Sequence, residues 1–210
     1  MKIINVIKII SFIALKKYPQ RVELINQGAN RIGAQNIEAR CWDLTEKPGF
    51  LEPESFDRIL VDAPCSGLGV LRRNPESRWS RRPADIRELV ELQRTILKQV
   101  APLLRPGGHL LYSVCTFTAA ETDAIVHNFL ATHPGFKQED FRTLLPTEWQ
   151  EMTTDKGCVR TLPHRHDGMD AFLQHGFLKA DWSKHFQIGY KGFILYLFFV
   201  PFVIFVVIAG

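Results

Sequence analysis

Short β-type runs alternate with amphipathic helical stretches along most of the chain, and this alternation is the feature that most limits its fold. An apolar run at 9–15 is followed by Pro19 and then by apolar residues at helical spacing, which Gly33 closes. Two further runs, at 37–42 and 56–61, are typical of strands. Strands that alternate with helices through short turns form a parallel sheet with helices on both faces. We therefore predict an α/β fold.

The middle of the chain is expected to continue this pattern. Pro83 is a favourable first-turn residue for a long helix, whose apolar face would run as far as Leu104. The sequence Arg-Pro-Gly-Gly at 105–108 is expected to stop that helix, and a strand should follow at 109–114.

A further helix is expected over 119–132. Thr118 and Glu121 have the spacing of a capping box, in which each side chain binds a backbone amide of the other residue.

Four residues of reactive type follow the predicted strands. Asp43, Asp62 and Cys65 come after the second and third strands, and Cys115 comes after the fourth. In sheets of this class, ligands bind outside the carboxyl ends of the strands. We therefore expect a functional site at this edge, although each aspartate could instead cap a local turn.

The cysteines are few and scattered. The 210 residues contain four of them, without a Cys-x-x-Cys pair, which argues against a disulfide scaffold and against a zinc site. Free thiols are typical of a cytoplasmic protein. We predict no bound metal.

Cys115 stands out because a strand precedes it and a predicted helix follows it. Helix N-terminal amides stabilise a thiolate, so this position favours a reactive cysteine. The alternative is a buried and inert thiol, which is the usual state of a free cysteine. We expect that inert state for Cys41 and Cys158.

Residues 72–82 contain five arginines and one glutamate, a local charge of +4 that equals the net charge of the whole chain. Arginine suits phosphate groups, and Trp79 between the arginines offers a stacking face for a base. We interpret this stretch as an RNA-binding segment. A solvated basic loop is the alternative.

Three longer motifs point to one family. They are DAPCSGLGVLRRNPESRW at 62–79, the stretch RPGGHLLYSVCTFTAAE at 105–121 and LPHRHDGMDAF at 162–172. Together they resemble the RNA cytosine-C5 methyltransferases of the Nol1/Nop2/Sun family, in particular their bacterial Sun/Fmu branch, which acts on small-subunit rRNA. The resemblance covers residues 14–172. It implies a Rossmann-like class I methyltransferase domain that uses S-adenosylmethionine.

The resemblance also implies roles for individual residues. Cys115 matches the nucleophile that adds to C6 of the target cytosine, and Cys65 matches the second cysteine, associated with product release. Asp43 matches an acid beside the adenine of the cofactor, and Asp62 matches one near its methionine end. The segment expected to face RNA, namely small-subunit (16S) rRNA, contributes Arg72, Arg73, Arg78 and Trp79.

The sequence departs from the family pattern in three places. A first strand and a glycine-rich cofactor loop, which the family has before the 9–15 strand, have no counterpart here. Lys16 stands where an acid would bind the ribose hydroxyls, and residues 174–176 are expected to break the strand that follows Phe172. Residues 1–180 are therefore expected to form a partial catalytic domain, with an inactive truncation as one interpretation.

Residues 181–210 form an atypical tail. The stretch 193–209 contains 17 residues without a charge, which as a helix would span about 25 Å, at the short edge of what crosses a bilayer. The tail is either a membrane anchor, with the main body in the cytoplasm, or an aberrant terminus. The corresponding alternative function is a non-catalytic, membrane-tethered RNA-binding protein.

Overall fold

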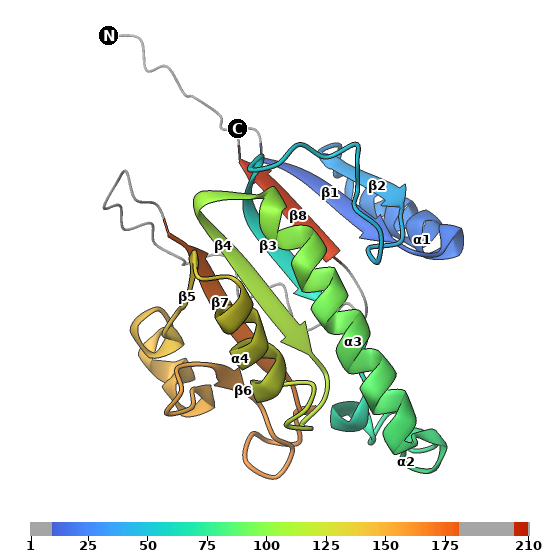
Figure 1. Cartoon of the computed structure of the whole chain (residues 1–210). Coiled ribbons are helices and arrows are strands. Elements are labelled where there is room, and N and C mark those ends of the chain that lie inside the picture. Colours follow the sequence, from blue (N-terminus) through green and yellow to red (C-terminus); the bar gives the residue numbers. More distant parts are fainter. Residues whose placement is uncertain (1–9, 181–203, 210) are drawn as a thin grey trace, which may run out of the picture.

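The computed structural model describes residues 10–180 and 204–209. In these ranges one mixed sheet has the strand order β2-β1-β8-β3-β4-β7-β5, with β6 paired to β7 (Figure 1). The strands are β1 (Ile10–Lys16), β2 (Ile37–Cys41), β3 (Phe56–Asp62), β4 (Leu104–Val114), β5 (Phe136–Gln138), β6 (Val159–Arg160), β7 (Leu173–Lys179) and β8 (Ile204–Ala209). The helices are α1 (Pro19–Ile32), the single turn α2 (Ser77–Ser80), α3 (Pro83–Val100) and α4 (Asp123–Thr132).

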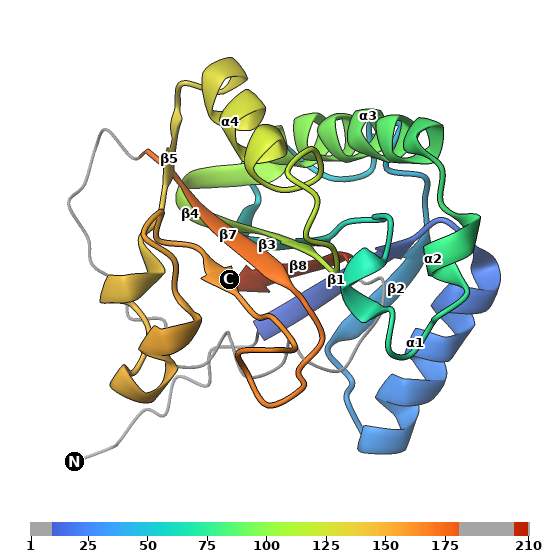
Figure 2. The same ribbon diagram turned by 90° about the horizontal axis from the view of Figure 1, so that it is seen from below.

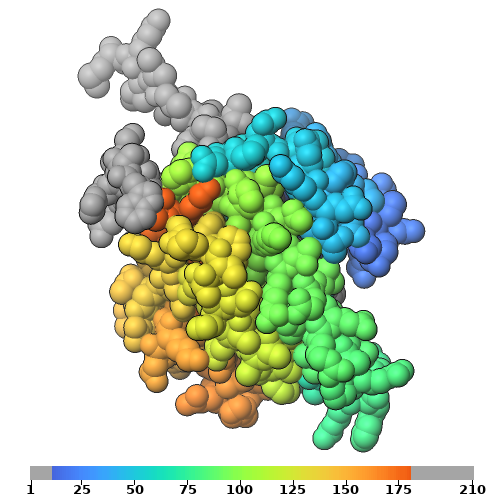
Figure 3. All heavy atoms as spheres, viewed as in Figure 1, coloured from blue at the N-terminus to red at the C-terminus, as the bar shows by residue number. Residues whose placement is uncertain are grey.

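Helices cover both faces of the sheet, as the sequence predicts. Helices α3 and α4 lie side by side over one face (Figure 1), and the green and yellow atoms of this region cover that face in Figure 3. Helix α1 and the segment between β5 and β6 lie on the other face (Figure 2). Successive strand residues point to opposite faces. Ile59 and Leu110 accordingly belong to the main core cluster, and their neighbours Leu60 and Leu111 pack in a smaller cluster with Phe141.

Strands β1, β2, β3 and β4 run in one direction and place their carboxyl ends at one edge. Strands β1 and β2 are parallel, as are β3 and β4. Strand β8 is antiparallel to both β1 and β3, so these two also run the same way. The prediction of a parallel sheet is therefore confirmed for these four strands, whereas β7 and β8 run in the opposite direction.

The end of α3 differs from the prediction. The helix stops at Val100, and β4 already begins at Leu104 and includes 105–108. Gly107 takes a left-handed φ of 74°, and the pairing of β4 with β3 is irregular between Phe56 and Arg58. A glycine and a bulge let the strand absorb a sequence that otherwise marks a turn.

The expected break at residues 174–176 is wrong, because β7 is continuous and pairs with β4 along its length. Gln174 and His175 are buried. At Gly176 a Cβ would lie 3.0 Å from the Phe141 ring and 3.1 Å from the Glu139 carboxylate, so this glycine permits a close approach within the strand.

Only the last part of the apolar tail is described. Residues 204–209 form β8, which lies between β1 and β3, and residues 193–203 of the proposed anchor lie outside the described ranges. Among the helices of residues 10–180, none combines the length and the apolar character that a bilayer crossing requires. The membrane anchor and the boundary at residue 181 stay predictions.

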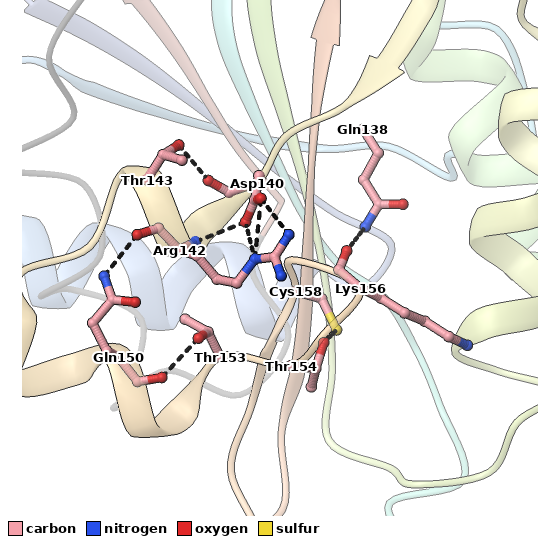
Figure 4. Close-up of polar contacts among 9 residues, drawn as sticks. All are labelled: Gln138, Asp140, Arg142, Thr143, Gln150, Thr153, Thr154, Lys156 and Cys158. Carbon is pink, nitrogen blue, oxygen red and sulfur yellow. Dashed lines mark hydrogen bonds and ion pairs between the residues drawn. The ribbon is translucent and has the colours of Figure 1, made fainter.

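The segment between β5 and β6 is held by its own polar contacts (Figure 4). The Arg142 guanidinium binds the Asp140 carboxylate at 2.6 Å, and Cys158 Sγ lies 2.9 Å from Thr154 Oγ1. Cys158 is 1% exposed, and burial raises the pKa of its thiol. This agrees with the buried, inert state expected for it, whereas Cys41, for which the same state is expected, is exposed.

Candidate active site

Cys65 and Cys115, which lie fifty residues apart in the sequence, meet at the carboxyl edge of the sheet. Their Sγ atoms are 3.2 Å apart. Cys65 follows β3 and is 5% exposed, whereas Cys115 directly follows β4 and is half-buried. The edge predicted from the strand pattern therefore brings the two cysteines into contact.

The two thiols differ in acidity. The hydrogen bond between them lowers the pKa of Cys115, while the same bond and burial raise the pKa of Cys65 well above its ordinary value. Cys115 is thus the more acidic thiol of the pair. Helix amides do not explain this, because α4 begins only at Asp123.

The predicted capping box is wrong. Glu121 does not bind the backbone amide of Thr118, and its carboxylate instead accepts hydrogen bonds from the Ser66 N–H at 2.7 Å and the Ser66 hydroxyl at 2.6 Å. The Thr118 hydroxyl also donates to it, at 2.7 Å. Glu121 is 0% exposed. It joins the loop after Cys115 to the loop of Cys65.

Gln93 also belongs to this site, although no sequence motif indicates it. It lies on the inner face of α3, is 0% exposed, and donates to the Pro64 carbonyl at 2.9 Å and to Glu121 at 3.2 Å. A glutamine among the apolar residues of a helix face is the signal that could have identified it.

The segment 162–172 also reaches this site. The Gly69 N–H donates to the Cys115 carbonyl at 2.9 Å, and the Gly69 carbonyl accepts from the Ala171 N–H at 2.8 Å. A Cβ on Gly69 would lie 2.1 Å from the Ala171 carbonyl oxygen. The nearly buried Asp170 pairs with Arg73 at 2.7 Å. Three sequence motifs thus form one contiguous unit.

The two aspartates lie at the same edge, each beside a lysine. The Asp43 carboxylate contacts the Lys17 ammonium at 2.7 Å, which lowers the pKa of Asp43, and it also accepts from the Thr45 N–H at 3.0 Å. Burial lowers the pKa of Lys16 to about 8, although Asp62 opposes this shift. The acidic side of the edge is therefore partly neutralised.

The basic segment is only partly free to meet a ligand. Arg72, Arg78 and Trp79 are exposed, Trp79 at 84%, and the Arg78 guanidinium lies 5.7 Å from the Trp79 ring centroid. Arg73 is held by Asp170, and the Arg81 side chain donates to the Ser66 carbonyl at 2.9 Å. Part of the basic segment therefore supports the cysteine loops.

No group of three or more His, Cys, Asp or Glu side chains that could hold a metal ion occurs within residues 10–180 and 204–209. The cysteine edge brings one thiol of lowered pKa into contact with a second thiol.

Comparison with known proteins gives a consistent result. The family described as 16S rRNA methyltransferase RsmB/F matches residues 3–177. The probable ribosomal RNA small subunit methyltransferase B of Bacillus subtilis is 39% identical over 164 residues, which cover 78% of this chain and 36% of that protein. A putative methyltransferase of Mycobacterium tuberculosis is 43% identical over 165 residues, 76% of this chain and 33% of that protein.

The solved structure of the protein PH0851 superposes with a TM-score of 0.72 at 30% identity, covering 80% of this chain and 36% of that one. The Rossmann-like methyltransferase fold predicted from the motifs is confirmed. The chain spans about a third of the length of the curated relatives it matches.

Proposed function

The chain belongs to the 16S rRNA methyltransferase RsmB/F family, and from that premise we propose that it methylates C5 of a cytosine in small-subunit rRNA through a covalent adduct on Cys115. S-adenosylmethionine is the methyl donor of this proposal. The observation that carries the proposal is the contact of 3.2 Å between Cys65 and Cys115 at the carboxyl edge, with the pKa of Cys115 lowered by that contact.

Each cysteine has a distinct task. The Cys115 thiolate adds to C6 of the cytosine, a carbon–sulfur bond forms, and the electron pair of the C5–C6 double bond moves to C5. When bound, S-adenosylmethionine supplies an electrophilic methyl group for C5. After a base removes the C5 proton, the electron pair restores the double bond and expels Cys115. The Cys65 thiol donates to Cys115 and stabilises this leaving thiolate.

The described residues fit S-adenosylmethionine in kind. Asp43 and Asp62 are carboxylates, which accept hydrogen bonds from amino and hydroxyl groups, whereas Lys16 cannot accept one from a ribose hydroxyl. Asp43 already contacts Lys17 and Thr45. A ligand that uses Asp43 must therefore displace the Lys17 ammonium, which weakens its binding.

The RNA would lie against the exposed side chains of Arg72, Arg78 and Trp79. Guanidinium groups bind phosphates, and an exposed indole stacks on a base. Arg73 would contribute less to RNA contact than the sequence suggests, because the nearly buried Asp170 carboxylate holds its guanidinium.

The test is transfer of labelled methyl from S-adenosylmethionine to unmodified 16S rRNA by the full chain. We expect the label at C5 of a cytosine, and we expect the Cys115→Ala variant to lose it. Cys41→Ser is the matched control, because Cys41 is exposed on β2 and lies away from the Cys65–Cys115 pair. Labelling that survives Cys115→Ala, or that falls on another atom, would contradict the mechanism.

A second measurement separates catalysis from RNA binding alone. RNA that contains 5-azacytidine traps an enzyme whose cysteine adds to C6, so a stable complex that depends on Cys115 is expected with RNA and not with DNA of the same sequence. RNA binding without a covalent complex would favour the non-catalytic alternative.

A further inference from the structure

We propose that Glu121 is a positioning residue that holds Cys65 and Cys115 together by linking the two loops that carry them. The catalytic role of Glu121 rests on the proposed function, whereas its hydrogen bonds to both loops are seen in the structure itself. Glu121 lies six residues after Cys115 and is 0% exposed.

On the Cys65 side, Glu121 fixes the residues that flank the cysteine. Oε1 accepts from the Ser66 N–H at 2.7 Å, and Oε2 accepts from the Ser66 hydroxyl at 2.6 Å. Gln93 donates to Oε1 at 3.2 Å and to the Pro64 carbonyl at 2.9 Å. The residues before and after Cys65 are therefore tied, directly or through Gln93, to the same carboxylate.

On the Cys115 side, Glu121 closes its own loop. Oε2 accepts from the Thr118 hydroxyl at 2.7 Å, and the Thr116 hydroxyl lies 3.3 Å away. Ser66 Oγ and Thr116 Oγ1 are 2.9 Å apart, so the residues that directly follow the two cysteines also contact each other. The carboxylate suits this place because it only accepts hydrogen bonds and all surrounding groups donate to it.

Glu121 does not act by lowering the pKa of Cys115. The hydrogen bond with Cys65 lowers the pKa of Cys115, whereas burial and the negative charges of Asp62 and Glu121 raise it. The charge of Glu121 therefore opposes formation of the thiolate. What Glu121 contributes to the site is the geometry that keeps Cys65 in hydrogen-bonding contact with Cys115.

The rate of disulfide formation between Cys65 and Cys115 measures this geometry directly. Diamide takes up the two thiol hydrogens and becomes the hydrazine, and the two sulfurs form the bond. The full chain with Cys41→Ser avoids cross-linking through the exposed cysteine. Neither RNA nor a methyl donor is needed, so the result holds independently of methyltransferase activity.

Three substitutions separate position from charge. Glu121→Ala removes the link, and Glu121→Asp keeps the charge on a side chain one methylene shorter; each should slow disulfide formation about tenfold or more. Glu121→Gln keeps the length of the side chain. Its amide N–H groups can donate to the hydroxyl groups that donate to the Glu121 carboxylate, so the rate of disulfide formation should stay within about threefold of the parent. The pH midpoint of Cys115 alkylation should fall in Glu121→Gln, because a negative charge is lost.

Glu139→Gln is the matched control, since Glu139 is a partly buried glutamate that contacts His109 instead of the cysteine loops. Near-ultraviolet circular dichroism verifies that each variant is folded. If Glu121→Ala does not fold, the rate of Glu121→Asp is the test of the proposal. The proposal is overturned if the folded Glu121→Asp forms the disulfide at the parent rate. Equal slowing by Glu121→Gln or by Glu139→Gln would overturn it too. If the disulfide rates are as expected but the full chain transfers no methyl group to rRNA, only the proposed function is overturned.

Discussion

The carboxyl edge of the sheet has two halves that are built differently. In the cysteine half, which comprises Cys65, Ser66, Cys115, Thr116 and Glu121, the polar groups are mostly buried and satisfy one another. The acidic half comprises Asp43 and Asp62 with Lys16 and Lys17. There the Asp43–Lys17 contact joins side chains that are 33% and 56% exposed.

This difference determines which half a ligand can rearrange. A buried hydrogen-bond network is costly to break because its members are left without partners. A solvent-exposed ion pair contributes little and exchanges easily. The cysteine geometry should therefore be fixed before any ligand arrives, whereas the acidic half can change when a cofactor binds.

The largest expected contrast is in stability. Glu121→Ala removes the acceptor of the Ser66 N–H and one of the two acceptors of the Gln93 amide, at about 1–3 kcal/mol for each group, so the free energy of unfolding should fall by about 2–6 kcal/mol. Asp43→Ala should change it little. Urea unfolding of both variants measures the contrast. Equal losses in the two variants would contradict the distinction between the halves.

The acidic half can be tested by restoring an acid. Lys16→Asp should strengthen binding of S-adenosylmethionine, because a carboxylate bound to sugar hydroxyls contributes about 1.5–3 kcal/mol, or about tenfold to hundredfold in Kd. Calorimetric titration of the full chain measures it. Lys98→Glu, on the exposed side of α3, changes the net charge similarly and should leave Kd unchanged. Equal affinity in parent and Lys16→Asp would show that Lys16 does not limit binding.

The cysteine half also depends on a close backbone approach. Gly69→Ala would place a Cβ 2.1 Å from the Ala171 carbonyl oxygen, so the loops must separate, and we expect a loss of about 1–3 kcal/mol in the free energy of unfolding. Gly49→Ala is the matched control, because nothing lies within 4 Å of its Cβ position. Urea unfolding compares the two. A tolerated Gly69→Ala would mean that the cysteine half is less tightly packed than described.

Local sequence patterns predicted the fold and the position of the site. Strands β1, β2 and β3 and helices α1 and α3 follow from periodicity, from Pro19 and Pro83 and from Gly33, which takes a left-handed φ of 70°. Cys65 and Cys115 could be placed at one edge because parallel strands bring their carboxyl ends together.

The remaining features depend on contacts that no local pattern contains. Thr118 and Glu121 have the correct spacing for a helix cap, but the glutamate binds Ser66, which lies 55 residues earlier. His175 is expected to break a strand, yet it is buried within β7, which pairs with β4. No local pattern predicts the contact of Lys17 with Asp43 either, because this contact forms only when the ends of β1 and β2 lie side by side.

The smallest effect expected is that of Lys17→Ala on stability. The Lys17 hydrogen bond lowers the pKa of Asp43 from its ordinary 3.8, so this carboxyl stabilises the fold above about pH 4 and the contribution is lost as pH falls through the lowered value. The pKa of Lys17 is raised from 10.5, so its contribution is present below that pH and is lost as pH rises through the raised value.

Urea unfolding curves of Lys17→Ala and the parent should therefore coincide in strong acid and differ only slightly at pH 7, since both side chains are solvent-exposed. Asp43→Asn should behave in the same way, because it removes the other partner of the same contact. A loss at pH 7 as large as that of Gly69→Ala would mean that the acidic half is as firmly held as the cysteine half. The acidic half could then not rearrange when a ligand binds, and the affinity gained by Lys16→Asp would need another explanation.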